Sequence, residues 1–185
     1  MTERPVRLVM VDRDGVINED SDSYIKSIAE WRPIAGSLEA IRALTHGGCR
    51  VVVVTNQSGV GRGLLDENTL AAIHNHMLAA VRTAGGDLAG IYYCPHTPDA
   101  DCACRKPRPG LFKRLERELG LSVRDAPYIG DKLSDVEAAE AAGARPILVR
   151  TGRGVEAEPE AVARGVAVFD DLSGAAHGLL AQFHA

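Results

Sequence analysis

Short apolar runs alternate along this chain with longer segments of helical periodicity, and this alternation limits the possible folds more than any other feature. The clearest run is Val51–Val54, whose β-branched residues are typical of a strand covered on both faces. Strands are expected at Leu8–Val11, Arg50–Val54, Gly90–Tyr93, Pro127–Ile129, Pro146–Val149 and Val166–Phe169. The alternation predicts an α/β fold, with a central parallel sheet and helices on both faces.

The segments between these runs predict the helices. Helices are expected at Ser37–Thr45, Glu67–Thr83, Gly110–Glu118, Asp135–Ala142 and Leu172–Phe183. Ser134 is expected to cap the fourth helix, with Glu137 three positions later completing a capping box. The polar stretch from Gly152 to Pro159 contains Gly and Pro and predicts a surface loop.

Size and charge limit the class of protein. A chain of 185 residues is expected to form a single domain over residues 1–185, with residues 94–104 as an inserted loop. No apolar run approaches the roughly 20 residues of a membrane helix, and the N-terminal stretch lacks a signal-peptide pattern. We therefore expect a cytoplasmic protein with no membrane partner, and a monomer. The net charge of −4 argues against a nucleic-acid partner.

Acidic side chains follow two of the expected strands. Asp12 and Asp14 come after the first strand, where each carboxylate tends to raise the pKa of the other. Asp131 follows the strand at Pro127–Ile129, whereas Asp135 is explained by the dipole of the helix that follows. Strand ends at one edge of a parallel sheet can share a cation, and Mg²⁺ prefers oxygen ligands. The sequence therefore predicts a magnesium and phosphate site at this edge.

The stretch "TNQSGVGRG", Thr55 to Gly63, follows the valine strand directly. Its hydroxyl, side-chain amides and glycines suit the binding of an anion, although a flexible loop is the alternative. It is not a P-loop, because no Gly-Lys-Ser/Thr follows.

Three cysteines and a histidine cluster in the expected loop 94–104. Cys94, His96, Cys102 and Cys104 supply a complete tetrahedral set for structural zinc, whereas a disulfide would leave one cysteine over. Cys49 lies far away in sequence and is expected in the core. Arg105 and Lys106 follow the zinc ligands and are placed to hold phosphate; the alternative is a solvated basic turn.

The residues His74 and His76 lie two positions apart on an expected helix. Such residues point to different faces of a helix, so we do not expect them to form a metal-binding pair.

Together these motifs resemble the haloacid-dehalogenase-type phosphatases. The matching elements are Asp12-Arg13-Asp14, Thr55, Lys106 and Gly130-Asp131, in the order of that family. The resemblance implies a Rossmann-like three-layer sandwich around a parallel sheet, with a zinc-bound loop and no large cap domain. Within the family, "DRDGVIN", "VTNQSGVGRG" and "CRKPRPG" look like the D-glycero-D-manno-heptose 1,7-bisphosphate 7-phosphatases.

The resemblance also implies roles for individual residues. Asp12 would be the nucleophile and form an aspartyl-phosphate, and Asp14 would be the general acid and then the general base. Thr55 and Lys106 would hold the phosphoryl oxygens. Mg²⁺ would bind Asp12, the backbone carbonyl of Asp14, and Asp131. The expected substrate-binding residues are Asn18, Asp20, Ser23, Asn56, Gln57, Ser58 and Arg105.

The implied activity is the Mg²⁺-dependent removal of the 7-phosphate from a heptose bisphosphate, in the synthesis of nucleotide-activated heptose. The zinc-containing histidinol-phosphate phosphatases are similar, and the short spacing from His96 to Cys102 leaves that activity open. The residues of the motifs "NQSGVGRG" and "GDKLSD", and the lack of room for a dehydratase domain, favour the heptose enzymes. A DNA 3′-phosphatase fits less well, because the chain has no basic, aromatic-rich stripe. The non-enzymatic alternative, a zinc-stabilised binding module, would give Asp12 and Asp14 no function.

Overall fold

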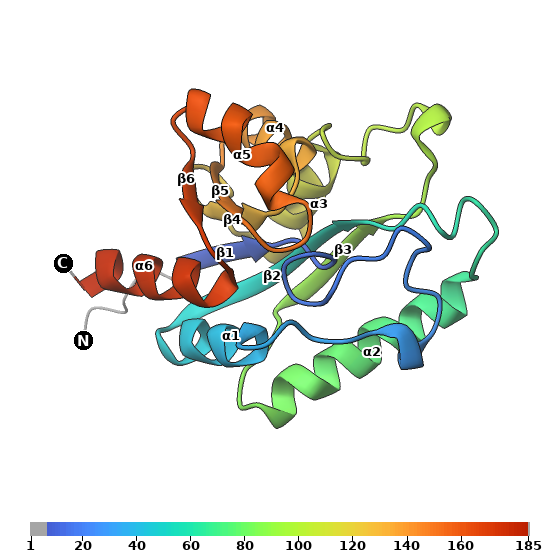
Figure 1. Ribbon diagram of the computed structural model, residues 1–185, viewed down its shortest axis with the longest axis horizontal. Coiled ribbons are helices and arrows are strands. Elements are labelled where there is room, and N and C mark those ends of the chain that lie inside the picture. The colour runs from blue at the N-terminus through green and yellow to red at the C-terminus, as the bar shows by residue number, and fades with distance from the viewer. Residues whose placement is uncertain (1–6, 185) are drawn as a thin grey trace.

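A single parallel sheet forms the centre of the molecule. The computed structural model describes residues 7–184, so residues 1–6 and 185 of the expected domain lie outside the described part. Six strands lie in the order β3-β2-β1-β4-β5-β6 (Figure 1). Their bounds are β1 Arg7–Val11, β2 Cys49–Asn56, β3 Gly90–Cys94, β4 Pro127–Gly130, β5 Arg145–Val149 and β6 Ala167–Phe169.

Helices cover both faces of this sheet. The helices α1 (Ser37–His46), α2 (Glu67–Thr83) and α6 (Leu172–His184) lie on one face (Figure 1). The helices α3 (Gly110–Leu119), α4 (Leu133–Ala142) and α5 (Gly154–Ala163) lie on the other. Two short 3₁₀ turns, Ile28–Glu30 and Pro98–Ala100, occur in the loops after β1 and β3. The expected three-layer α/β sandwich is therefore confirmed.

The two faces of the sheet make two cores. Val9 and Val53 belong to the core beneath α1, α2 and α6, whereas Met10 and Val52 belong to the core beneath α3 and α4. Adjacent strand residues thus point into opposite apolar layers, which explains why the valine run has no polar alternation.

Two local expectations were wrong. The stretch expected as a loop forms most of α5, in which Ala157 and Ala161 pack one turn apart against Leu148. This short stripe of small residues outweighs the helix-breaking effect of Pro159 inside the helix. In α4 the N-cap is Lys132 rather than Ser134, and its backbone N–H bonds to the Asp135 carboxylate.

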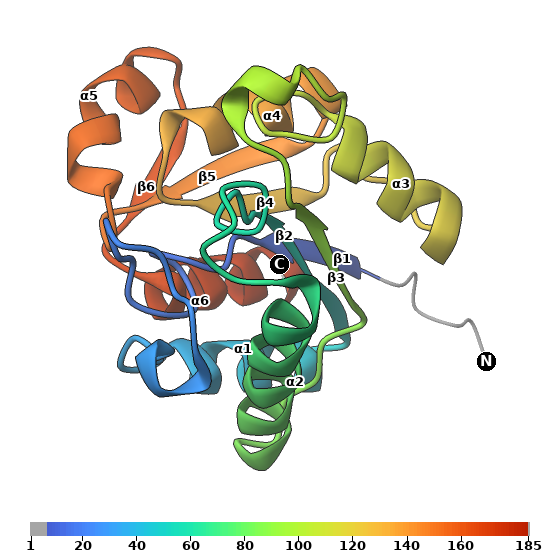
Figure 2. The same cartoon turned by 90° about the vertical axis from the view of Figure 1, so that its right-hand side faces the viewer.

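The strand order shows at which edge of the sheet a ligand site is expected. The chain runs outward from β1 to β2 and β3, then returns to the other side of β1 as β4. Such a reversal leaves a crevice at the carboxyl ends of the central strands, where open α/β sheets bind ligands. Figure 2 looks onto this edge, with the loop after β2 lying across its middle.

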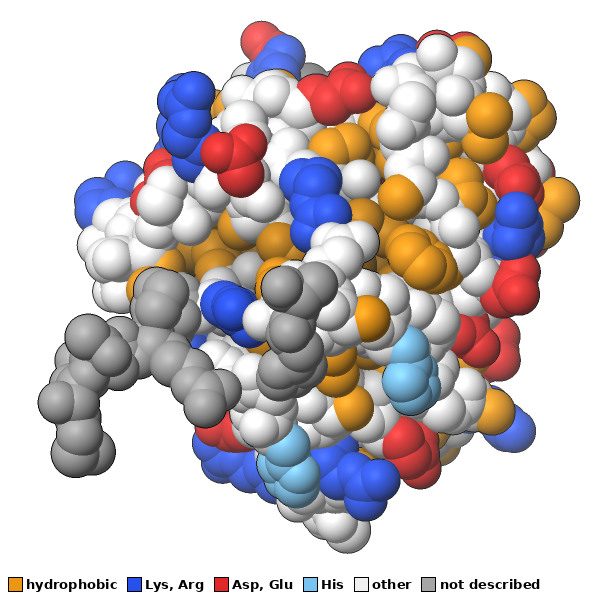
Figure 3. Space-filling view, turned by 90° about the vertical axis from the view of Figure 1, so that its left-hand side faces the viewer, with side chains coloured by type: hydrophobic (Ala, Val, Ile, Leu, Met, Phe, Trp, Pro, Cys, Tyr) orange, Lys and Arg blue, Asp and Glu red, His pale blue; other side chains and the backbone are white. Residues whose placement is uncertain are grey.

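The opposite, amino-end side of the sheet shows basic and acidic side chains interspersed around apolar ones (Figure 3). Among the described helices, none combines the length and the apolar character that a membrane span requires.

Candidate active site

Asp12 and Asp131 leave neighbouring strands at the crevice. The backbone N–H of Asp12 donates to the carbonyl of Ile129 at 2.8 Å, which continues the pairing of β1 with β4. Thr55 lies near the end of β2, on the other side of β1, and is 1% exposed. The sheet therefore brings three of the predicted residues to one edge.

Lys106 enters this edge from the loop after the cysteine cluster. Its Nζ lies 3.1 Å from Asp12 Oδ2 and 2.6 Å from Asp135 Oδ1. It also donates to the Val54 carbonyl at 3.1 Å and lies 2.6 Å from the Tyr128 hydroxyl. Burial lowers the pKa of Lys106, but the two carboxylates outweigh burial and raise it, so the amine stays charged.

Asp131 is enclosed by two glycines. A Cβ at Gly15 or at Gly152 would lie 2.2 Å from Asp131 Oδ2, and both residues have positive φ, at 81° and 59°. The backbone N–H of Arg153 donates to this oxygen at 2.9 Å. The other oxygen, Oδ1, is buried with no hydrogen-bond partner among the described residues. One carboxylate oxygen is thus fixed and the other is available.

This arrangement fits a divalent cation. Carboxylate oxygens of Asp12, Asp131 and Asp135 lie within 4.8 Å of one another. Burial raises the pKa of Asp12 and of Asp131, and neighbouring carboxylates add to the rise while lysines oppose it. Asp135 already accepts from Lys106, Tyr128 and two backbone N–H groups, so its oxygens are committed. Asp12 and Asp131 are the ligands best suited to Mg²⁺.

Asp14 faces the crevice with its carboxylate held by four donors. Arg13 donates to it through Nε at 2.9 Å and Nη2 at 3.0 Å, as a fork. The amides of Asn18 and Gln57 each donate at 2.9 Å. Burial raises the pKa of Asp14, but the guanidinium and the amides outweigh burial and hold it below its usual value.

A cleft of about 320 Å³ opens above Asp14. Of the predicted substrate-binding residues, five line it: Asp20, Asn56, Gln57, Ser58 and Arg105. Asn18 is fully buried beneath the cleft, and Ser23 is exposed outside its lining. The Asn56 amide is also used within the protein, since it brackets the backbone of Lys106 with two 3.1 Å hydrogen bonds.

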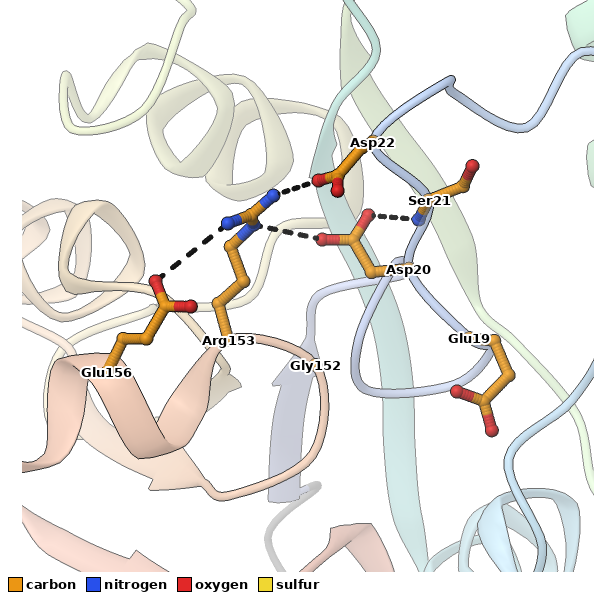
Figure 4. Close-up of a pocket in the computed structure, with 7 residues that line it drawn as sticks. All are labelled: Glu19, Asp20, Ser21, Asp22, Gly152, Arg153 and Glu156. Carbon is orange, nitrogen blue, oxygen red and sulfur yellow. Dashed lines mark hydrogen bonds and ion pairs between the residues drawn. The ribbon is translucent and has the colours of Figure 1, made fainter.

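Two cationic side chains at this cleft, Lys132 and Arg153, were not predicted from the sequence. Lys132 Nζ lies 3.0 Å from Asp20 Oδ2. Arg153 pairs closely with Asp22, and at 3.8 Å with both Asp20 and Glu156, so that the loop before α5 meets the turn after Asn18 (Figure 4). The contact of Arg153 with Asp22 spans 131 positions, so no local sequence pattern indicates it.

The predicted zinc ligands converge. The Sγ atoms of Cys94, Cys102 and Cys104 and Nδ1 of His96 lie 3.3–3.6 Å from one another in the contacting pairs. A tetrahedron with metal–sulfur bonds of about 2.3 Å has edges close to these lengths. All three cysteines are free thiols, and Cys49 is buried in the core as expected. The donor set fits a closed, four-ligand zinc site.

The comparisons with known proteins agree with this geometry. A family model described as HAD-hydrolase-like matches residues 103–175. The D-glycero-beta-D-manno-heptose-1,7-bisphosphate 7-phosphatase of Pseudomonas aeruginosa is 44% identical, over 94% of this chain and 97% of its own length. The relative of the same name from Bordetella bronchiseptica is also 44% identical, over 96% and 99%.

Solved structures give the same result. The crystal structure of D,D-heptose 1,7-bisphosphate phosphatase from B. bronchiseptica, complexed with magnesium and phosphate, matches with a TM-score of 0.89 at 43% identity. The match covers 96% of this chain and 99% of that one. The corresponding enzyme from Burkholderia thailandensis matches with a TM-score of 0.70 at 38% identity, over 94% and 98%.

Proposed function

Because the chain belongs to the family of D-glycero-beta-D-manno-heptose-1,7-bisphosphate 7-phosphatases, within the haloacid-dehalogenase superfamily, we propose that it removes the 7-phosphate of that sugar bisphosphate. The relatives are named for the beta anomer, which is therefore the proposed substrate. The main supporting observation is the meeting of Asp12, Asp131 and Lys106 beneath a cleft that Asp14 and Arg105 line.

Asp12 is the proposed nucleophile. One of its carboxylate oxygens would form a bond to phosphorus while the bond from phosphorus to the sugar oxygen breaks. Because the pKa of Asp14 is held low, its minor protonated form would give a proton to the departing oxygen, and the resulting carboxylate would take one from the water that hydrolyses the aspartyl-phosphate. Lys106, which contacts Asp12, and the buried Thr55 would stabilise the transferred phosphoryl group.

The two metals have separate proposed roles. Bound by Asp12, Asp131 and the Asp14 carbonyl, Mg²⁺ would neutralise the negative charge that otherwise keeps a carboxylate away from a phosphate. Zinc on Cys94, His96, Cys102 and Cys104 would be structural, because four protein ligands leave no open position. It would hold the loop that carries Arg105 and Lys106.

Parallel assays with Mg²⁺ test this function. The purified protein should release phosphate from heptose 1,7-bisphosphate with a much higher kcat/KM than from histidinol phosphate. A preference for histidinol phosphate would replace the substrate assignment but keep the chemistry. No turnover of either compound, or of p-nitrophenyl phosphate, would contradict the phosphatase function.

A further inference from the structure

Arg13 is a buried cation whose role the phosphatase motif does not explain. It lies between Asp12 and Asp14, is 0% exposed, and is among the largest fully buried side chains of the described residues. Its fork binds the Asp14 carboxylate through Nε and Nη2, as described above. The remaining nitrogen, Nη1, points away from Asp14 and lies 3.2 Å from Nε2 of His74.

This contact fixes the state of the imidazole. A guanidinium has five N–H donors and no acceptor, so the hydrogen bond requires a lone pair on Nε2 of His74. The ring is therefore neutral, with its proton on Nδ1. Burial, and secondly the Arg13 charge, lower the pKa of His74 to about 3, in agreement with a neutral ring.

The surroundings of His74 hold the ring in place. The residue lies on the buried face of α2 and is 6% exposed. Its ring meets that of Tyr93 edge to face at 5.4 Å, and the Tyr93 hydroxyl donates to Glu67 at 2.7 Å. The helix therefore holds Nε2 of His74 in a fixed position beside Nη1 of Arg13.

We propose that His74 is a positioning residue for the phosphatase reaction, which acts through Arg13 to hold Asp14 in the orientation for proton transfer. The inference rests on the proposed function of Asp14. Without the Nε2 acceptor, a buried N–H of Arg13 would lose its partner, and the guanidinium would turn to find another. The fork on Asp14 would then loosen, although Asp12, Lys106 and the metal ligands would keep their contacts.

Leaving-group dependence separates positioning from a general structural role. A sugar alkoxide needs a proton from Asp14 to leave, whereas p-nitrophenolate is stable enough to leave without one. His74→Leu should therefore slow formation of the phospho-enzyme from the heptose bisphosphate by about tenfold or more, which is part of the full effect of general acid catalysis. The burst of p-nitrophenolate should keep its rate and amplitude, followed by a slower steady state, because Asp14 also serves the hydrolysis step.

Two variants serve as controls. His74→Gln places an amide oxygen near the position of Nε2 and should recover most of the lost rate. His76→Leu changes an exposed histidine on the same helix and should leave both substrates at the parent rates. Equal slowing of the first step for the two substrates, or failure of His74→Gln to recover, would overturn the positioning role. A parent protein inactive on both substrates would instead overturn the proposed function.

A spectroscopic measurement on the unmodified protein keeps the proposal testable if His74→Leu does not fold. Nitrogen-15 chemical shifts of the His74 ring at neutral pH should show the neutral form with the proton on Nδ1. A proton on Nε2, or a doubly protonated ring, is incompatible with the Arg13 hydrogen bond and would contradict the inference.

Discussion

Arg105 should distinguish a bisphosphate from a monophosphate substrate. It follows the zinc loop and lines the cleft, while the adjacent Lys106 is buried and turned toward Asp12. The Arg105 guanidinium donates to the backbone carbonyl of His96 at 3.2 Å. That contact uses one nitrogen, Nη1, and the remaining N–H groups would bind a remote phosphate that is not cleaved, in the bidentate manner typical of Arg. The perturbation to test is Arg105→Ala.

The size of the effect follows from the type of contact. A hydrogen bond to a charged group contributes about 1.5–3 kcal/mol. Since about 1.4 kcal/mol corresponds to a factor of ten in rate, Arg105→Ala should lower kcat/KM for the heptose bisphosphate roughly tenfold to a hundredfold. The value for p-nitrophenyl phosphate, which has no second phosphate, should change by less than about threefold on the same scale.

The assay is steady-state phosphate release with both substrates at saturating Mg²⁺. Arg108→Ala is the matched control, because Arg108 lies on the same loop but pairs with Asp101 and lies outside the lining of this cleft. That variant should keep the parent ratio of the two kcat/KM values. Equal losses on the two substrates in Arg105→Ala would refute the reasoning, since Arg105 would then serve the transferred phosphoryl group or the fold.

Further predictions concern the nucleophile, the zinc loop and the buried ion pair. Asp12→Asn should abolish turnover with a melting temperature close to that of the parent, and near-normal activity would exclude Asp12 as nucleophile. Protein purified without chelator should contain about one zinc per chain, whereas Cys102→Ser should lose zinc and activity together; metal analysis showing no zinc in the parent would rule out the site. Asp135→Ala should destabilise the fold by about 3–5 kcal/mol, because it removes the closest carboxylate from a buried lysine. Urea denaturation measures that change, with the half-buried Glu137→Ala as control on the same helix, and a loss below about 1 kcal/mol would contradict the ion-pair argument.

The sequence predicted the layers of the fold because each depends on a local pattern. Within residues 7–184, all six strands and five of the six α-helices lie within a few residues of their expected positions. The helix α5 was missed because Gly152 and Pro159 suggested a turn, whereas Ala157 and Ala161 become a buried stripe only when β5 is beside them. A stripe of two small residues gives a weak periodic signal.

Part of the candidate site could be predicted because its residues lie close together in the sequence. The candidate zinc ligands and the pair of aspartates were recognised from residue type and spacing, without knowledge of the tertiary structure. By contrast, Asp135 was assigned to the helix dipole, although it is also the closest carboxylate to Lys106. Arg13 and His74 lie 61 positions apart, so their pairing cannot be read from either local segment. Contacts between distant segments need the fold before they can be recognised.

The Lys106 amine touches four separate parts of the sandwich: the end of β1, the carbonyl of Val54 in β2, the phenol of Tyr128 in β4, and Asp135 in α4. The Lys106 amine therefore stabilises the packing of these elements and is also a candidate catalytic group. Loss of activity in a Lys106 variant would thus combine the loss of a catalytic group with the loss of fold stability. Complexes with trapped substrate are better sought with Asp12→Asn, which leaves the amine and its other three attachments in place.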